Sequence, residues 1–218
     1  MSLYLFLRRG RRASLGETQW PAPHAREPGA WLEAGIDAPP DSIQAYPPDE
    51  LAWCLDEELW EVELEGDLHR EGHALVAARG RLLSRVETWT PDVAAELVET
   101  CAFRVRDAAA DALARAGLAS EASDLAGCTS LDALERVGSD IAARSTDPAA
   151  TVAGFATDAV LYARDATSPA RAAGVAAYVA AHALAGGDRG VTSYEARFAD
   201  ERRWQAEWLS RRLGLSTR

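Results

Sequence analysis

The chain has 218 residues, of which 48% are hydrophobic and 26% charged, a composition typical of a globular protein with one domain and at most a small appendage. Its 34 acidic and 23 basic side chains give a formal net charge of -11. This balance argues against nonspecific nucleic-acid binding, which needs a dense cationic surface, and it permits a basic protein partner.

Cysteine usage and hydropathy indicate the compartment. Cys54, Cys101 and Cys128 form no Cys-x-x-Cys pair, and an odd number cannot close a full disulfide set. Reduced thiols are typical of the cytoplasm, so we expect a cytoplasmic protein. No window approaches the ~20 apolar residues that span a bilayer, so no membrane association is expected.

The first ninety residues carry mainly strand patterns. An apolar run over 3–7 precedes an Arg-Arg-Gly-Arg-Arg turn, and hydrophobic residues alternate with glutamates over 60–65. Further strands are expected over 73–78 and 82–86, and a short helix over 48–55. The segment from Pro21 to Pro48 holds seven of the ten prolines, which predicts a long irregular loop whose role stays open.

Helical patterns dominate after residue 90. Thr90, Asp147 and Ser168 each precede a proline, the arrangement of an N-cap followed by the first helical residue. Apolar stripes at helical spacing predict helices over 91–116, from 131 behind an N-cap at Thr129, over 152–163, over 172–186 and over 193–213.

These patterns together predict an α+β protein. A small antiparallel β-sheet with a proline-rich loop packs on a C-terminal bundle of about five helices. We expect two parts, a β-rich subdomain over 1–89 and a helical bundle over 90–218.

Four polar residues suggest a metal site between two glycines. Asp67, His69, Glu71 and His73 alternate along the chain, so in an extended segment all four share one face and suit zinc. The alternative is a solvated hairpin loop, which is naturally rich in such residues. We favour the loop and expect no resident metal.

An acidic row precedes this segment. Glu61, Glu63 and Glu65, continued by Asp67, lie on the outer face of one strand, where they can receive a basic partner or supply catalytic carboxylates. The alternative is cross-strand pairing with the arginines of the following strand, which we favour because exposed charge rows are mostly solvated. Those arginines are Arg79, Arg81 and Arg85.

Two helical positions carry candidate polar groups. Tyr178 and His182 lie four residues apart and suit either proton transfer or packing, of which packing is favoured. In the last helix, Glu201 and Gln205 fall inside an apolar arc with Trp204 and Trp208. They either anchor the helix or line a binding pocket floored by the two tryptophans, and we expect Arg202 and Arg203 to point away from that arc.

Two stretches resemble known families. Tyr46-Pro47-Pro48 with the segment from Leu59 to Gly66 resembles a domain of unknown function common in phage and bacterial proteins, although that family's Gly-x-His-x-Cys segment is absent. The segment from Arg171 to Leu184, with Glu-Arg-Arg-Trp-Gln at 201–205, resembles helical immunity proteins of actinobacteria. The whole chain resembles an uncharacterised actinobacterial family.

The leading functional hypothesis is a non-enzymatic interaction protein, immunity-like or antitoxin-like, that binds a basic protein partner without a cofactor. Acidity, the aromatic-rich N-terminal region and the absence of phosphate-loop, nucleophile-elbow and dinucleotide motifs favour it. The binding residues would be Glu61, Glu63, Glu65, Trp204 and Trp208. The alternative is an enzyme of metal-dependent or ADP-ribosyl-transfer type, with Glu61 and Glu63 as its catalytic carboxylates.

Overall fold

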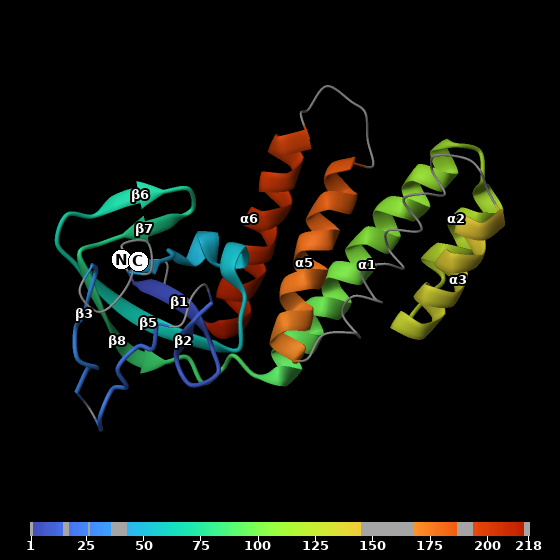
Figure 1. The fold of residues 1–218 in the computed structure, drawn as a ribbon. Coiled ribbons are helices and arrows are strands. Elements are labelled where there is room, and N and C mark those ends of the chain that lie inside the picture. The colour runs from blue at the N-terminus through green and yellow to red at the C-terminus, as the bar shows by residue number, and fades with distance from the viewer. Residues whose placement is uncertain are drawn as a thin grey trace. The chain divides into compact units, whose positions relative to one another are not determined.

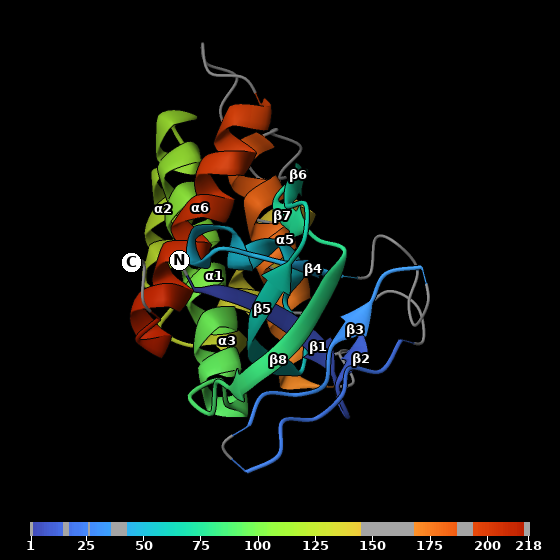
Figure 2. The ribbon, with the colours of Figure 1, turned by 90° about the vertical axis from the view of Figure 1, so that its left-hand side faces the viewer.

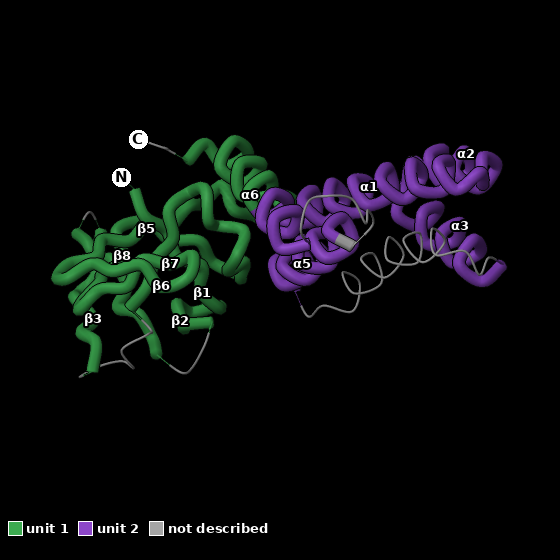
Figure 3. Tube along the Cα trace, turned by 90° about the horizontal axis from the view of Figure 1, so that it is seen from above, with its two compact units in different colours: residues 1–93, 203–218 green, residues 94–202 purple. Residues whose placement is uncertain are grey.

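The computed structural model describes residues 2–14, 18–25, 27–35, 43–144, 168–186 and 194–215. Over these residues the fold is α+β, as the sequence predicts. The chain forms two compact units, shown in Figure 3. Unit 1 contains Met1–Val93 and Arg203–Arg218, and unit 2 contains Ala94–Arg202. The end of the last helix therefore clusters with the strands, whereas the sequence placed all of 90–218 in one part.

Unit 1 is built on a five-stranded antiparallel sheet in the order β2-β1-β5-β8-β3, visible in Figures 1 and 2. Its strands are β1 (Leu3–Arg8), β2 (Arg12–Ala13), β3 (Leu32–Glu33), β5 (Glu58–Glu65) and β8 (Arg79–Arg85). The predicted strand at the N-terminus, its arginine turn and the alternating strand are confirmed. Strand β1 is buried over Leu3–Leu7 because it lies inside the sheet with apolar side chains on both faces.

A second sheet of three strands has the order β4-β7-β6. Its strands are β4 (Gln44–Ala45), β6 (His69–Glu71) and β7 (Ala74–Val76). The turn between β6 and β7 has Gly72 at φ +58°, a backbone angle that suits the first central position of a type II′ hairpin turn. The sequence predicts a loop where β6 lies, because the polar and glycine-bracketed residues of this edge strand carry no apolar alternation.

The core of unit 1 combines both sheets with the 3-10 helix η2 (Pro48–Cys54). Phe6 contacts Trp89 edge-on, with ring centroids 5.3 Å apart. The end of the last helix joins this core: Ser210 Oγ donates a buried hydrogen bond to the Pro48 carbonyl at 2.9 Å, and Leu209 is fully buried. The fully buried large side chains of this unit are Phe6, Leu7, Trp20, Ile43, Leu51, Leu59, Leu82 and Leu209.

Unit 2 consists of helices. They are α1 (Pro91–Arg115), α2 (Ala119–Ala126), α3 (Leu131–Arg144), α5 (Pro169–Gly186) and α6 (Tyr194–Leu213). The boundary between the units falls within the first of them, α1, and within the last, α6. The predicted caps at Thr90 and Ser168 are confirmed, since each hydroxyl accepts the amide three residues later. Gly117, at φ +83°, ends α1 with the two backbone bonds of a Schellman motif.

The helices differ from the predicted ones at the start of α3 and in the presence of α2. The N-cap of α3 is Ser130 instead of Thr129, because the Ser130 hydroxyl accepts the Ala133 amide at 3.2 Å. Helix α2 was not predicted, since only Ala122 and Leu125 of its eight residues are buried. The predicted stripe over 152–163 lies outside the described residues. In the described part, five α-helices and η2 make six helical elements, against the predicted five or so.

Candidate functional site

The predicted acidic row lies on β5 and is paired across the sheet. The Arg81 guanidinium lies 2.6 Å from Glu63, and that of Arg79 lies 2.5 Å from Glu65. Glu61 accepts a hydrogen bond from Ser84 Oγ at 3.2 Å, because an irregularity at residues 61 and 62 shifts the register. The predicted partner Arg85 lies instead 3.9 Å from Glu87. Most of this row therefore stabilises the sheet.

The arginine turn between β1 and β2 is also held by carboxylates. The backbone amides of Gly10 and Arg11 donate to Glu58 at 3.0 and 3.2 Å, and the amide of Arg9 donates to Glu57 at 2.8 Å. Trp60 Nε1 donates to the same Glu58 carboxylate at 3.2 Å. Successive amides of a tight turn form a concave site for an anion, and here a side chain of the protein fills it.

The four residues of the metal hypothesis are divided between two places. Asp67, His69 and Glu71 line an open hollow of about 530 Å³, whose floor includes the buried Val76 and Ala77. Among the described residues, no group of three or more histidine, cysteine, aspartate or glutamate side chains converges as a metal site. The convergence that zinc requires is therefore not found in this part of the chain.

His73 lies apart from that hollow, at the second position of the two-residue hairpin turn. Its ring stacks on Trp53 of η2, with centroids 3.6 Å apart and planes 9° from parallel. Its Nδ1 lies 2.9 Å from Glu50, whose other oxygen is 3.5 Å from Arg70. This group attaches the hairpin to η2, so its first role is structural.

Two polar residues of α6, Glu201 and Arg202, lie in unit 2. Glu201 is 5% exposed and accepts two hydrogen bonds from the Arg104 guanidinium, at 2.6 and 3.1 Å. The prediction that Arg202 points away from the apolar arc is wrong, since this side chain is only 4% exposed, whereas Arg203 is exposed. Burial lowers the pKa of Arg202 to about 10, and burial raises the pKa of Cys101 to about 12.

The predicted binding residues of the last helix line neither the hollow beside β6 nor a second hollow between α2 and α3. Trp204 and Trp208 are half-buried on α6. Tyr178 and His182, four residues apart on α5, belong to an aromatic cluster in which the His182 ring is 4.3 Å from Tyr178 and 4.7 Å from Phe198. His182 Nδ1 is also hydrogen-bonded to the Tyr194 hydroxyl. The favoured packing role of His182 agrees with these contacts.

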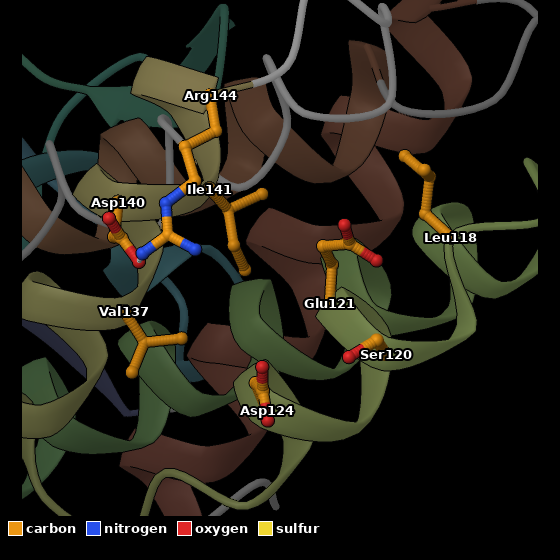
Figure 4. Close-up of a pocket in the computed structure, with 8 residues that line it drawn as sticks. All are labelled: Leu118, Ser120, Glu121, Asp124, Val137, Asp140, Ile141 and Arg144. Carbon is orange, nitrogen blue, oxygen red and sulfur yellow. Dashed lines mark hydrogen bonds and ion pairs between the residues drawn. The ribbon is translucent and has the colours of Figure 1, made fainter.

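A second hollow, of about 440 Å³, lies between α2 and α3. Its apolar lining consists of Leu118, Val137 and the buried Ile141. Figure 4 shows the side chains of α2 on one side and those of α3 on the other, with the Arg144 guanidinium beside Asp140. The polar side chains that line it are Ser120, Glu121, Asp124, Asp140 and Arg144.

The two walls of this hollow differ in charge. On α3, Asp140 and Arg144 form an ion pair four residues apart, which neutralises that wall. On α2, Glu121 and Asp124 lie three residues apart on one face. Within the described part of the chain, neither carboxylate forms an ion pair or a side-chain hydrogen bond. One wall is therefore anionic, and the other is apolar with a balanced charge pair.

The patterns in the sequence do not predict this hollow. Its floor comes from the approach of two helices, of which α2 was not predicted. The one signal in the sequence was the spacing of Glu121 and Asp124, which places two carboxylates on one face of any helix through them.

Comparison of the chain with models of protein families, with curated proteins and with solved structures found no match. Of the helices in the described ranges, none has the length and apolar character that a membrane crossing requires.

Proposed function

We propose that this protein is a non-enzymatic interaction protein, immunity-like or antitoxin-like, that binds a basic protein partner in the cytoplasm. The observation that carries the proposal is the hollow between α2 and α3, where an apolar floor adjoins Glu121 and Asp124. Buried apolar area supplies affinity, and carboxylates at the rim that have no ion-pair partner in the described part of the chain select a cationic partner. The net charge of -11 adds long-range attraction for the same class of partner.

The binding surface is thus assigned to α2 and α3 in place of the acidic row on β5. Glu63 and Glu65 are paired with arginines of the neighbouring strand, so little of their charge is available to a partner. On the same strand, Arg81 pairs with Glu63 and Ser84 donates to Glu61, so each of the two alternative catalytic carboxylates has a partner on the neighbouring strand. Binding is therefore the function that the geometry supports best.

The test compares capture from a native lysate by three immobilised forms of the protein at low and high salt. They are the wild type, a double variant with Glu121→Gln and Asp124→Asn, and a charge-matched control with Glu99→Gln and Asp111→Asn on the exposed face of α1. We expect the wild type and the control to retain the same basic protein at low salt, and the hollow variant to lose it. Equal capture by all three forms would contradict the proposal.

A further inference from the structure

We infer that the hollow between α2 and α3 accepts an amphipathic helix of the partner, with its basic residues along one edge only. This inference rests on the proposed function and adds the shape and orientation of the bound segment. Its basis is the difference between the two walls, the anionic one with Glu121 and Asp124 and the apolar one with Val137 and Ile141.

The arrangement of the walls favours a helix over an extended segment. The anionic and the apolar wall run side by side along two neighbouring helices, so an occupant must present basic and apolar side chains in adjacent columns. A helix does so, because residues three and four apart form columns that lie next to each other on its surface. An extended chain directs successive side chains to opposite faces, so its second column would point away from the hollow.

The dimensions agree with this mode of binding. The lining residues of α3, from Val137 to Arg144, follow one face over two turns, a length of about 10 Å at 1.5 Å per residue. A partner helix that lies in the groove between two helices packs its ridges as a third helix of a bundle does. Apolar residues at positions i, i+3 or i+4 and i+7 of the partner would contact Val137 and Ile141.

Charge fixes the orientation of the bound helix. The cationic edge must lie on the α2 side, since Glu121 and Asp124 are the carboxylates of this hollow that have no partner among the described residues. On the α3 side, Arg144 already neutralises Asp140 and would repel a second cation. For a given chain direction, a helix with its arginines on the other edge would bring them against Arg144 when its apolar stripe contacts the hollow.

The experiment uses three fluorescent peptides of equal length and equal arginine content, each about 16 residues long so that the first two, which share one composition, can form a helix. In the first, the arginines lie along one edge of the apolar stripe. In one of the two possible chain directions, this edge faces α2. In the second, they are placed on the polar back of the helix, away from the stripe. The third has an alternating sequence with prolines, which prevents a helix. Fluorescence anisotropy measures Kd for the wild type, for the Glu121→Gln and Asp124→Asn variant, and for Arg144→Gln.

We expect the first peptide to bind at least tenfold more tightly than the other two, and to lose about tenfold in the double variant, as the loss of two partly exposed ion pairs implies. Arg144→Gln frees Asp140 and should strengthen binding of the first peptide. If the alternating peptide binds as well as the first and still depends on Glu121 and Asp124, the helix is excluded while the proposed function stands. Equal binding of the two helical peptides overturns the orientation. If none binds, the inferred helix-binding mode fails, and the capture experiment above decides the proposed function separately.

Discussion

The carboxylates of the five-stranded sheet and those of α2 are the same chemical groups in opposite situations. On the sheet, Glu63 and Glu65 meet arginines of the next strand, and Glu58 accepts three hydrogen bonds at the arginine turn. On α2, Glu121 and Asp124 have no such partner among the described residues. Net charge does not distinguish these groups. The residues around each carboxylate distinguish them: a carboxylate with a partner in the fold stabilises the fold, and one without such a partner can bind another protein.

The comparison predicts a ranking of substitutions by their effect on stability, with Glu201 first. Glu201→Gln removes the buried carboxylate that pairs with Arg104, and it removes a negative charge near the buried guanidinium of Arg202. We expect the free energy of unfolding to fall by about 3 kcal/mol, the low end for breaking a buried ion pair, because Arg104 is 36% exposed. Urea unfolding followed by circular dichroism measures this change.

The matched control for Glu201 is Glu207→Gln, at an exposed position of the same helix α6. Glu207 is 52% exposed and lies 3.7 Å from Arg211, so its removal should change the free energy of unfolding by less than about 0.5 kcal/mol. Similar losses for both variants would show that burial of Glu201 does not decide its contribution.

Glu58 comes second. Glu58→Ala removes the acceptor of the Gly10 and Arg11 amides and of Trp60 Nε1. We expect a loss of about 2 kcal/mol, because hydrogen bonds to a charged group contribute more than neutral ones and the amides of the turn lose their acceptor. Hydrogen exchange should speed up at Gly10 and Arg11. Unchanged exchange at these two amides would show that the carboxylate does not hold the turn.

The parts of the fold that the sequence predicted depend on local chemistry. Thr90-Pro91 and Ser168-Pro169 begin helices because the hydroxyl and the proline act on neighbouring backbone groups. Gly117 ends α1 for the same local reason. The strand β5 was predictable because one of its faces is buried and the other meets water, which leaves a period of two in the sequence.

The parts that escaped prediction depend on contacts between distant residues. Arg202 is buried near Cys101 of α1 and Tyr178 of α5, and no pattern within α6 can reveal these neighbours. The four metal candidates separate because His73 lies in the two-residue turn that follows Glu71, and so leaves the strand that carries His69 and Glu71. The α2–α3 hollow arises from the approach of two helices, so only the spacing of its carboxylates was visible in the sequence.

The paired row of β5 should show a smaller effect than Glu58. Glu63→Gln removes an ion pair whose side chains are 43% and 28% exposed, so we expect a loss of about 0.5 kcal/mol. A double-mutant cycle with Arg81→Gln isolates the coupling between the two side chains, which should be of the same size. A coupling near zero would place Glu63 among the carboxylates that are available to a partner, and would weaken the contrast with α2.

The smallest effect on stability should come from α2 itself. Glu121 and Asp124 have no partner to lose within the described residues, and their like charges lie three residues apart on one helix face. The double variant Glu121→Gln with Asp124→Asn should therefore unfold with a free energy unchanged or raised by a few tenths of a kcal/mol, since removing the repulsion of like charges favours the helix. Urea unfolding at low salt measures the change, and the gain should shrink at high salt, where the repulsion is screened. A loss above about 1 kcal/mol would assign these carboxylates a structural role, because a group that stabilises the fold must have a favourable contact to lose. A stability-neutral variant that no longer binds the basic partner would instead separate binding from folding at the same two residues.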